Sequence, residues 1–266
     1  SDLSELCLIS GSVEQAVQYG RESVIYVDRG SIDFHKMSKR TTFADALHAA
    51  GEYDEATALF NIAEKKQQES QPEYRYLYSL WGYRYCDLLL SQGRYMEVLV
   101  RTEETLRWAK GNNASLLTLA LDHLSLGRAH FAKRQAENTA SPEAGKWLNE
   151  AVEGLRKAGT INNLPLGLLA RAAWHRYEGR YAEAYEDLEE VMEIAGSGGM
   201  RLYLVDYHIE KASPGPSKGG EKGISIAAWA EGKFPDAKPA AWHKAEALRL
   251  IGETGYKRRL KEAEAL

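Results

Sequence analysis

The chain has 266 residues, of which 44% are hydrophobic and 27% are charged. These values are ordinary for a globular protein and exclude both a wholly disordered chain and a disulfide-stapled miniprotein. Lys and Arg number 34 against 38 Asp and Glu, a net charge of -4. The basic footprint of a nucleic-acid-binding protein is therefore missing, and we expect no nucleic-acid partner.

The cysteines and the hydropathy pattern predict the compartment. Cys7 and Cys86 form neither a CxxC motif nor a metal-spaced cluster, which favours a reduced, cytoplasmic protein without a thiolate zinc site. No run approaches the roughly 18 consecutive apolar residues that a membrane-spanning helix needs, and no leader pattern is present, so we expect no membrane contact. The chain starts at Ser1 without Met, and residues 6–10 resemble the end of a helix, so we expect a fragment of a longer protein.

One sequence pattern recurs along the chain: Gly, any residue, Tyr, two spacers and a small apolar residue. It begins at Gly51, Gly93 and Gly179, and the separations are 42 and 86 residues, the second being twice 43. Gly11, followed by Ala16, predicts a truncated first copy. A fourth copy is expected at residues 124–158, with residues 133–142 inserted so that its turn is lengthened.

Both halves of each copy have the apolar spacing of helices, three and four residues apart. The second copy has this spacing at Phe43, Leu47 and Ala50 and again at Ala56, Leu59, Phe60 and Ala63, and the fifth at Leu168, Ala172 and His175 and again at Ala184, Leu188, Val191 and Ala195. We therefore expect two antiparallel helices in each copy and no strands. The glycine suits the left-handed conformation that ends a helix, and the Tyr can pack over the bend.

The second helices carry a small, bulky, small pattern that resembles the tetratricopeptide repeat. Ala56-Phe60-Ala63 matches it fully, Ala144-Leu148-Ala151 and Ala184-Leu188-Val191 match with substitutions, and Val98-Thr102-Thr105 departs from it. The resemblance implies an all-α, right-handed α-solenoid of stacked antiparallel helix pairs over residues 1–212. In such an array the first helices line a concave surface.

Two phrases, at residues 153–159 and 199–202, are similar to the C-terminal arrays of bacterial signalling NTPases of the apoptotic-ATPase (STAND) type. That resemblance implies that the array senses a ligand or partner, while a separate domain binds the nucleotide.

The C-terminal part departs from the repeat. Residues 213–239 are rich in Pro and Gly and predict a loop, because helices do not cross such a stretch. Residues 240–266 return to helical spacing and predict terminal capping helices.

Charged and polar residues on the first helices are the candidate binding residues. Asp45 and Asp87 lie 42 residues apart and so occupy equivalent places in adjacent copies. This row could hold a peptide or a small ligand by charge-assisted hydrogen bonds, or it could form an internal salt-bridge ladder between adjacent first helices. Its members are Thr41, Asp45, Arg84, Asp87, Asp122, Arg128, Arg171 and Asp206.

The densest local signal is an aromatic run at residues 74–85. Tyr74, Tyr78, Trp81 and Tyr85 follow helical spacing and are expected in the core. Tyr76 and Tyr83 are placed on another face and are the candidates for stacking on a ligand.

Catalytic motifs are mostly missing. Residues 215–220 have the glycine spacing of a phosphate-binding loop, but Glu221 stands where Lys is required. His123 and His130 share a helical face beside Asp122, so a metal enzyme is a minor alternative. His208 and Glu210 resemble the start of a zinc deaminase motif, but the paired cysteines are missing. Cys86 is placed inside a helical stripe, and residues 257–259 form a basic cluster that suits a helix end.

The sequence therefore predicts a non-catalytic interaction or sensor module without a cofactor, which binds a peptide or protein partner on its concave face. A small-molecule-sensing array is the alternative. Under the first reading, Tyr83→Ala or Arg128→Ala weakens partner binding and leaves the thermal midpoint nearly unchanged.

Overall fold

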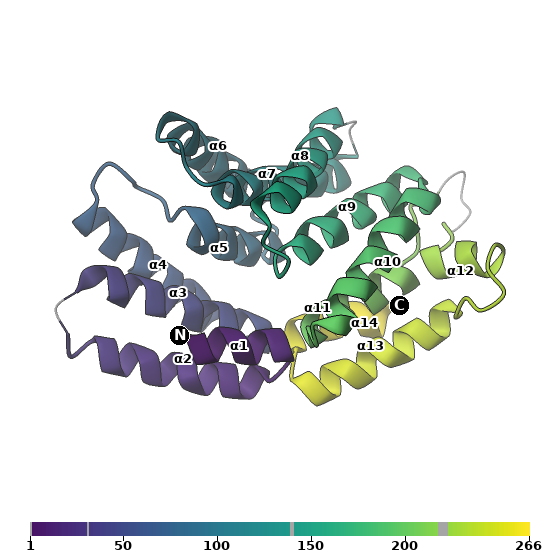
Figure 1. Ribbon diagram of the computed structural model, residues 1–266, viewed down its shortest axis with the longest axis horizontal. Coiled ribbons are helices and arrows are strands. Elements are labelled where there is room, and N and C mark those ends of the chain that lie inside the picture. Colours follow the sequence, from purple (N-terminus) through teal and green to yellow (C-terminus); the bar gives the residue numbers. More distant parts are fainter. Residues whose placement is uncertain (1, 31, 139–140, 218–222) are drawn as a thin grey trace. The chain divides into compact units, whose positions relative to one another are not determined.

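The computed structural model describes residues 2–30, 32–138, 141–217 and 223–266 (Figure 1). Within these residues the chain is all-α, and the one extended pairing is an isolated antiparallel bridge between Pro214 and Ser225. The predicted all-α class is confirmed. The structure divides into two compact units, residues 1–8 with 12–159 (unit 1) and residues 9–11 with 160–266 (unit 2).

Up to residue 159 the helices in chain order are α1 (Asp2–Ser10), α2 (Val13–Val27), α3 (Asp33–Ala50), α4 (Tyr53–Ser70), α5 (Ser79–Ser91), α6 (Tyr95–Gly111), α7 (Leu116–Glu137) and α8 (Pro142–Ala158). α3 packs on α4 and α7 packs on α8, as predicted for the second and fourth copies. α3 also packs on α2 and α7 on α6, while α5 lies more closely against α3 and α7 than against α6, its predicted partner.

The glycine at each predicted junction has the left-handed conformation that ends a helix. Gly51 has φ 85°, and its N–H and that of Glu52 donate to carbonyls of the last turn of α3 at 3.0 and 2.9 Å. The ring of Tyr53 lies edge-on to that of His48, 5.7 Å between centroids, so the Tyr packs over the bend as predicted. Gly93 and Gly179 repeat this backbone, with φ 73° and 79°.

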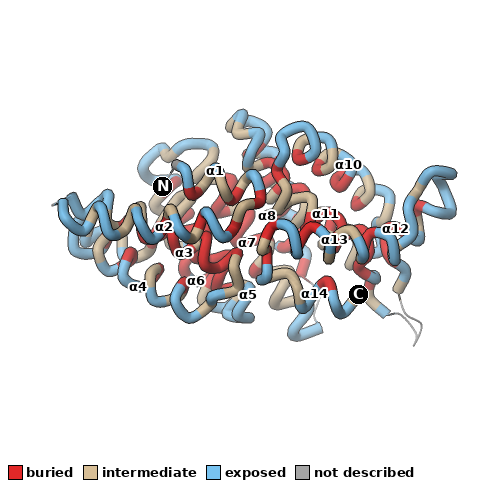
Figure 2. Tube along the Cα trace, turned by 90° about the horizontal axis from the view of Figure 1, so that it is seen from below, coloured by how far each residue is buried: buried red, intermediate tan, exposed pale blue. Residues whose placement is uncertain are grey.

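The second helices bury the small and bulky positions of the repeat pattern. Ala56, Phe60 and Ala63 have no exposed surface, nor have their counterparts on α8 and on α10 (Tyr181–Ser197). Figure 2 shows buried residues running along α3 and α7 in unit 1. In the departing third copy, Thr102 and Thr105 are also buried, and the Thr105 hydroxyl donates to Asp122 at 2.9 Å. At these positions the third copy therefore has a buried polar contact, whereas the other copies bury apolar side chains.

The fourth copy differs from its predicted form. Residues 133–137 were expected in a lengthened turn, but α7 continues through Glu137. These residues include Lys, Arg, Gln, Ala and Glu, which are good helix formers, so the insertion extends the first helix. Residues 139 and 140 lie outside the described residues.

Unit 2 contains two further pairs. α9 (Leu164–Glu178) packs on α10, and α11 (Arg201–Ala212) packs on α13 (Ala240–Thr254), so α13 pairs with α11 where a terminal cap was expected. A 3₁₀ turn (Lys257–Arg259) and α14 (Leu260–Ala265) follow.

The predicted loop at 213–239 contains a short helix, α12 (Ile226–Glu231). The hydroxyl of Ser225 accepts from the backbone N–H of Ala228 and caps its start. Ile226, Ala227 and Ala230 are buried, so local capping and apolar contact order a segment whose Pro and Gly content predicted a loop. Residues 218–222 of that loop lie outside the described residues.

Candidate functional site

Five of the predicted binding residues, on α5 and its neighbours α3 and α7, have one another as partners. Arg84 lies 3.0 Å from Asp45 on α3 and 3.0 Å from Glu5 on α1. Arg128 on α7 lies 2.6 Å from Asp87. We use the name polar ladder of unit 1 for the set Glu5, Asp45, Arg84, Asp87, Arg128, Tyr83 and His48.

The pair of Arg128 and Asp87 has further contacts. Arg128 also donates to the hydroxyl of Tyr83 at 3.1 Å, and His48 Nδ1 lies 3.6 Å from the other oxygen of Asp87. Both Arg84 and Asp87 are buried. This arrangement is the internal salt-bridge alternative for the row, and it uses much of the hydrogen-bonding capacity that a ligand on these side chains would need.

The other predicted polar residues have different partners. Thr41 is fully buried, and its hydroxyl donates to Ser38 at 2.8 Å. Arg171 pairs with Asp187 on α10, at 2.6 and 3.0 Å. Asp206 accepts from Arg259 at 2.7 Å, so one residue of the basic 257–259 cluster serves an internal pair.

Asp122 faces α6, where Thr105 donates to one of its oxygens, and the other oxygen is buried without a partner among the described residues. Burial raises the pKa of Asp122 to about 7, although the hydrogen bond from Thr105 lowers it. The carboxyl is therefore partly protonated at neutral pH, which reduces the cost of burying it.

The aromatic run is placed differently from its helical spacing. α5 begins at Ser79, so Tyr74, Tyr76 and Tyr78 lie in the α4–α5 loop, and the prediction of a helical core position for Tyr74 and Tyr78 is wrong. Tyr85 does lie in the core, stacked on Phe60. The Gln67 side chain donates to the carbonyls of Tyr74 and Tyr76, which fixes the loop outside the helix.

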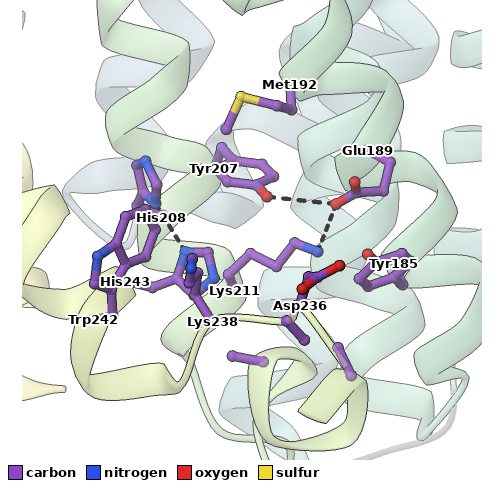
Figure 3. A pocket seen from close by; sticks show the side chains of 13 residues that line it. Tyr185, Glu189, Met192, Tyr207, His208, Lys211, Asp236, Lys238, Trp242 and His243 are labelled. Atoms are coloured by element: carbon purple, nitrogen blue, oxygen red, sulfur yellow. Dashed lines mark hydrogen bonds and ion pairs between the residues drawn. The ribbon is translucent and has the colours of Figure 1, made fainter. Parts of the chain in front are cut away.

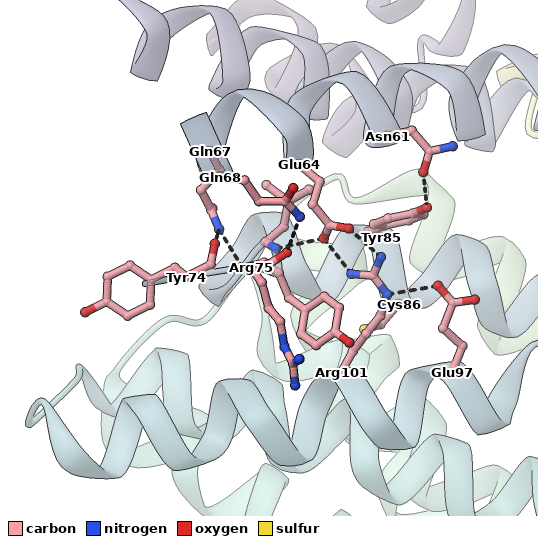
Figure 4. Close-up of polar contacts among 12 residues, drawn as sticks. Asn61, Glu64, Gln67, Gln68, Tyr74, Arg75, Tyr85, Cys86, Glu97 and Arg101 are labelled. Carbon is pink, nitrogen blue, oxygen red and sulfur yellow. Dashed lines mark hydrogen bonds and ion pairs between the residues drawn. The ribbon is translucent and has the colours of Figure 1, made fainter. Parts of the chain in front are cut away.

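Tyr76, a predicted ligand-stacking residue, instead covers a buried cation. The Arg101 guanidinium lies 4.7 Å from the Tyr76 ring centre and 4.4 Å from that of Tyr85. Glu64 accepts from both of its terminal nitrogens, at 2.6 and 2.7 Å, and also from the backbone N–H of Leu77 (Figure 4). This network joins α4, α6 and the loop in unit 1.

The side chains considered for catalysis have other neighbours in the structure. No group of three or more metal-binding side chains is found in the described parts of the chain, and His123 lies beside Glu150 and Trp147. Burial raises the pKa of the Cys86 thiol to about 11, so it is a thiol at neutral pH. Gly215 pairs with the carbonyl of Ile224, and part of the glycine-rich stretch lies outside the described residues.

A pocket in unit 2 is the strongest candidate site in the part of the chain that is described. It has a volume of about 210 Å³ and is bounded by α10, α11, α12, α13 and the loop before α13. Its walls are mostly aromatic or apolar, and a few polar groups converge on it (Figure 3). Tyr185, Glu189 and Met192 line it from α10, and Tyr207, His208 and Lys211 from α11.

The pocket holds a buried ammonium group. Lys211 is only 3% exposed, and its Nζ lies 2.8 Å from Glu189 Oε1 and 3.6 Å from the ring centre of Tyr185. Burial lowers the pKa of Lys211, while the hydrogen bond and charge of Glu189 raise it. The hydroxyl of Tyr207 reaches the same oxygen of Glu189, at 3.4 Å.

A pair of histidines forms the opposite wall. His208 Nδ1 and His243 Nδ1 lie 2.8 Å apart, and Trp242 stands beside both rings. Burial lowers the pKa of His208 to about 4 and that of His243 to about 3. Both rings are therefore neutral at physiological pH.

Sequence reasoning passed over this pocket. Every residue of α11 from Val205 to Ala212 is buried, so its polar members, including Lys211, must find partners inside the protein. A helical lysine with no acidic residue three or four positions away in the sequence was the available signal. The wall formed by α12 could not be anticipated from a segment that predicted a loop.

Comparison with protein-family models finds no match, and comparison with curated proteins finds none either. Among the described helices, none combines the length and apolar character that crossing a bilayer requires.

Proposed function

We propose that this chain is a tetratricopeptide-like helical-repeat module that senses a small molecule and acts by binding, not by catalysis. The observation that carries this proposal is the pocket of unit 2, which combines aromatic walls with a few fixed polar groups. Its volume of about 210 Å³ lies below the ~300–1,000 Å³ of pockets for drug-sized ligands. A small metabolite fits this size better than a folded partner does.

The wider arrangement follows from the repeats. Paired helices ended by left-handed glycines support stacking into a right-handed solenoid, because a single pair leaves an apolar face uncovered. In the signalling NTPases that the sequence resembles, such an array controls a separate nucleotide-binding domain. We propose the same division here.

A thermal-shift screen of metabolites tests the sensing function. A ligand present at 100 times its Kd stabilises the fold by about 2.7 kcal/mol. Ala237→Trp fills the pocket from its loop wall and should abolish the shift, whereas Ala182→Trp, on an exposed position of α10, should retain it. A ligand whose effect survives Ala237→Trp would bind elsewhere and contradict the assignment of the pocket.

A protein or peptide partner, the reading favoured by the sequence, keeps one supporting observation. A row of partly exposed rings crosses the surface of unit 1, with neighbouring centroids 5.2–6.2 Å apart. Aromatic side chains dominate protein interfaces because they offer large contact area with few rotatable bonds. The row comprises Phe34, Trp81, Tyr78, Tyr74 and Trp108.

Phe34 is 49% exposed, so Phe34→Ala should weaken binding of such a partner without lowering the thermal midpoint. Calorimetric titration with the partner checks this expectation. Unchanged affinity in Phe34→Ala and Trp81→Ala would remove the aromatic row as an interface.

A further inference from the structure

Two buried donors in the pocket converge on one acceptor that is itself exposed. Lys211 Nζ and Tyr207 Oη both point to Glu189 Oε1, at 2.8 and 3.4 Å (Figure 3). Lys211 is 3% and Tyr207 6% exposed, whereas the Glu189 side chain is 47% exposed. The donors are held by packing, while the acceptor can turn into solvent.

The donors fix the chemistry of whatever takes the place of Glu189. A buried ammonium without an anion is strongly unfavourable, so the position requires a negative charge. The ring of Tyr185 holds the ammonium in place, because its Nζ lies 3.6 Å from the ring centre. A carboxylate is the anion that already fits this position.

The rest of the pocket limits the size and charge of the ligand. Lys211 is the one buried cation among the lining residues, while Asp236 and Lys238 are exposed and of opposite sign. A single negative charge is therefore matched by a buried cation, whereas the opposite charges of Asp236 and Lys238 offset each other. Met192, Ala227 and Trp242 leave apolar surface for the remainder of a small ligand.

We propose that the pocket binds a small organic monocarboxylate whose carboxylate displaces that of Glu189 from Lys211 and Tyr207. Glu189 then occupies the site only when the ligand is absent, and it competes with the ligand. This inference rests on the proposed function, because it names the ligand class of the same pocket.

The competition gives opposite results for two neighbouring substitutions. Phenylacetate is the probe, and phenylacetamide is its neutral match. Glu189→Ala removes the competitor and should bind phenylacetate at least tenfold more tightly than the unmodified chain. Lys211→Met removes the charged donor and should abolish binding, and Tyr207→Phe should weaken it severalfold. Phenylacetamide should bind none of these proteins measurably.

Affinities are measured by calorimetry on the full chain, with circular dichroism to confirm folding of each variant. If Glu189→Ala is unstable because Lys211 has lost its anion, phenylacetate should raise its thermal midpoint more than that of the unmodified chain. Equal or weaker binding of phenylacetate to a folded Glu189→Ala overturns the proposal.

A third probe separates this inference from the proposed function. If benzylamine or phenylacetamide binds, and Ala237→Trp abolishes that binding, the pocket is a ligand site but the carboxylate assignment is wrong. If no probe and no metabolite binds in the pocket, both proposals fail together.

Discussion

His208 on α11 and His243 on α13 share a buried hydrogen bond between their Nδ1 atoms, 2.8 Å long. One nitrogen must donate and the other accept, so the two rings cannot both be protonated while the bond exists. Their neighbours include Lys211 and Arg249, whose charges lower the pKa of His208, and Glu246, whose charge raises it. The contact between α11 and α13 therefore depends on pH.

The stability of unit 2 should fall as the pH is lowered from about 6.5 to about 4. The unfolded chain binds protons at each histidine near pH 6.5, whereas the folded pKa values are about 4 and about 3. The unfolded state thus binds more protons in this window, and stability is lost on the order of 1.4 kcal/mol per pH unit for each ring. Urea unfolding at pH 7.5 to 4.5 measures this slope.

His243→Gln is the matched variant, since it keeps a hydrogen-bonding side chain without a titrating ring. The dependence of its stability on pH should be weaker than that of the unmodified chain. His175 also has a pKa lowered to about 4 by burial, so some slope should remain. Identical slopes in His243→Gln and the unmodified chain would contradict the role of the pair.

Glu64→Gln should lower the free energy of unfolding by up to about 3–5 kcal/mol, because it removes the carboxylate that pairs with both terminal nitrogens of the buried Arg101 guanidinium. Glu97, 3.1 Å from Arg101 Nε, remains as a partner and limits the loss. It should also speed amide hydrogen exchange in the α4–α5 loop, since the N–H of Leu77 donates to the same carboxylate. Chemical denaturation and exchange mass spectrometry check the two effects.

An exposed ion pair provides the control for Glu64→Gln. Arg249 pairs with Glu246 and Glu253 in open solvent, so Arg249→Ala should change stability little. A loss of stability in Glu64→Gln no larger than that in Arg249→Ala would mean that Glu97 or water compensates the Arg101 guanidinium.

The repeat spacing predicted much of the fold because it marks the residues at which one helix ends and the next begins. A left-handed glycine followed by a Tyr and a small apolar residue ends one helix and starts the next, and this holds at Gly51, Gly93 and Gly179. The α4–α5 loop was missed because Glu64 and Gln67, thirteen and seven or more residues away, hold its backbone. Helical spacing contains no information about such contacts.

The candidate site was less predictable for a related reason. Sequence placed Asp45 and Asp87 at equivalent positions, but which arginine pairs with each depends on contacts 39 and 41 residues away along the chain. The pocket depends on α12, whose order comes from the Ser225 cap and burial of Ile226. Composition alone described that segment as a loop.

Gly127→Ala should destabilise unit 1 by about 1–3 kcal/mol. A Cβ at Gly127 would lie 2.7 Å from Leu148 Cγ and 3.0 Å from its backbone nitrogen, so α7 and α8 would have to separate. Gly196→Ala, in the last turn of α10, would meet only Met192 Sδ at 3.8 Å and should be neutral or stabilising by up to about 1 kcal/mol. Thermal unfolding compares the two, and equal effects would contradict the close crossing.

Arg128→Ala should lower the free energy of unfolding by about 1–3 kcal/mol, which revises the nearly unchanged midpoint expected from sequence. The substitution leaves the buried Asp87 without its 2.6 Å partner and removes a donor to Tyr83. Tyr83→Phe removes only the hydroxyl and should cost less, about 0.5–1.5 kcal/mol. Arg107→Ala, whose side chain is 70% exposed, is the control.

The measurement that decides between ladder and recognition surface is a double-mutant cycle of Arg128→Ala with Asp87→Asn. If the two residues support each other, the losses should be less than additive, with a coupling energy of about 0.5–3 kcal/mol. A coupling energy near zero, together with weakened partner binding and an unchanged thermal midpoint in Arg128→Ala, would indicate that these residues bind a partner and do not stabilise the fold. The cycle works because Asn keeps the size of Asp87 while removing the charge that Arg128 neutralises.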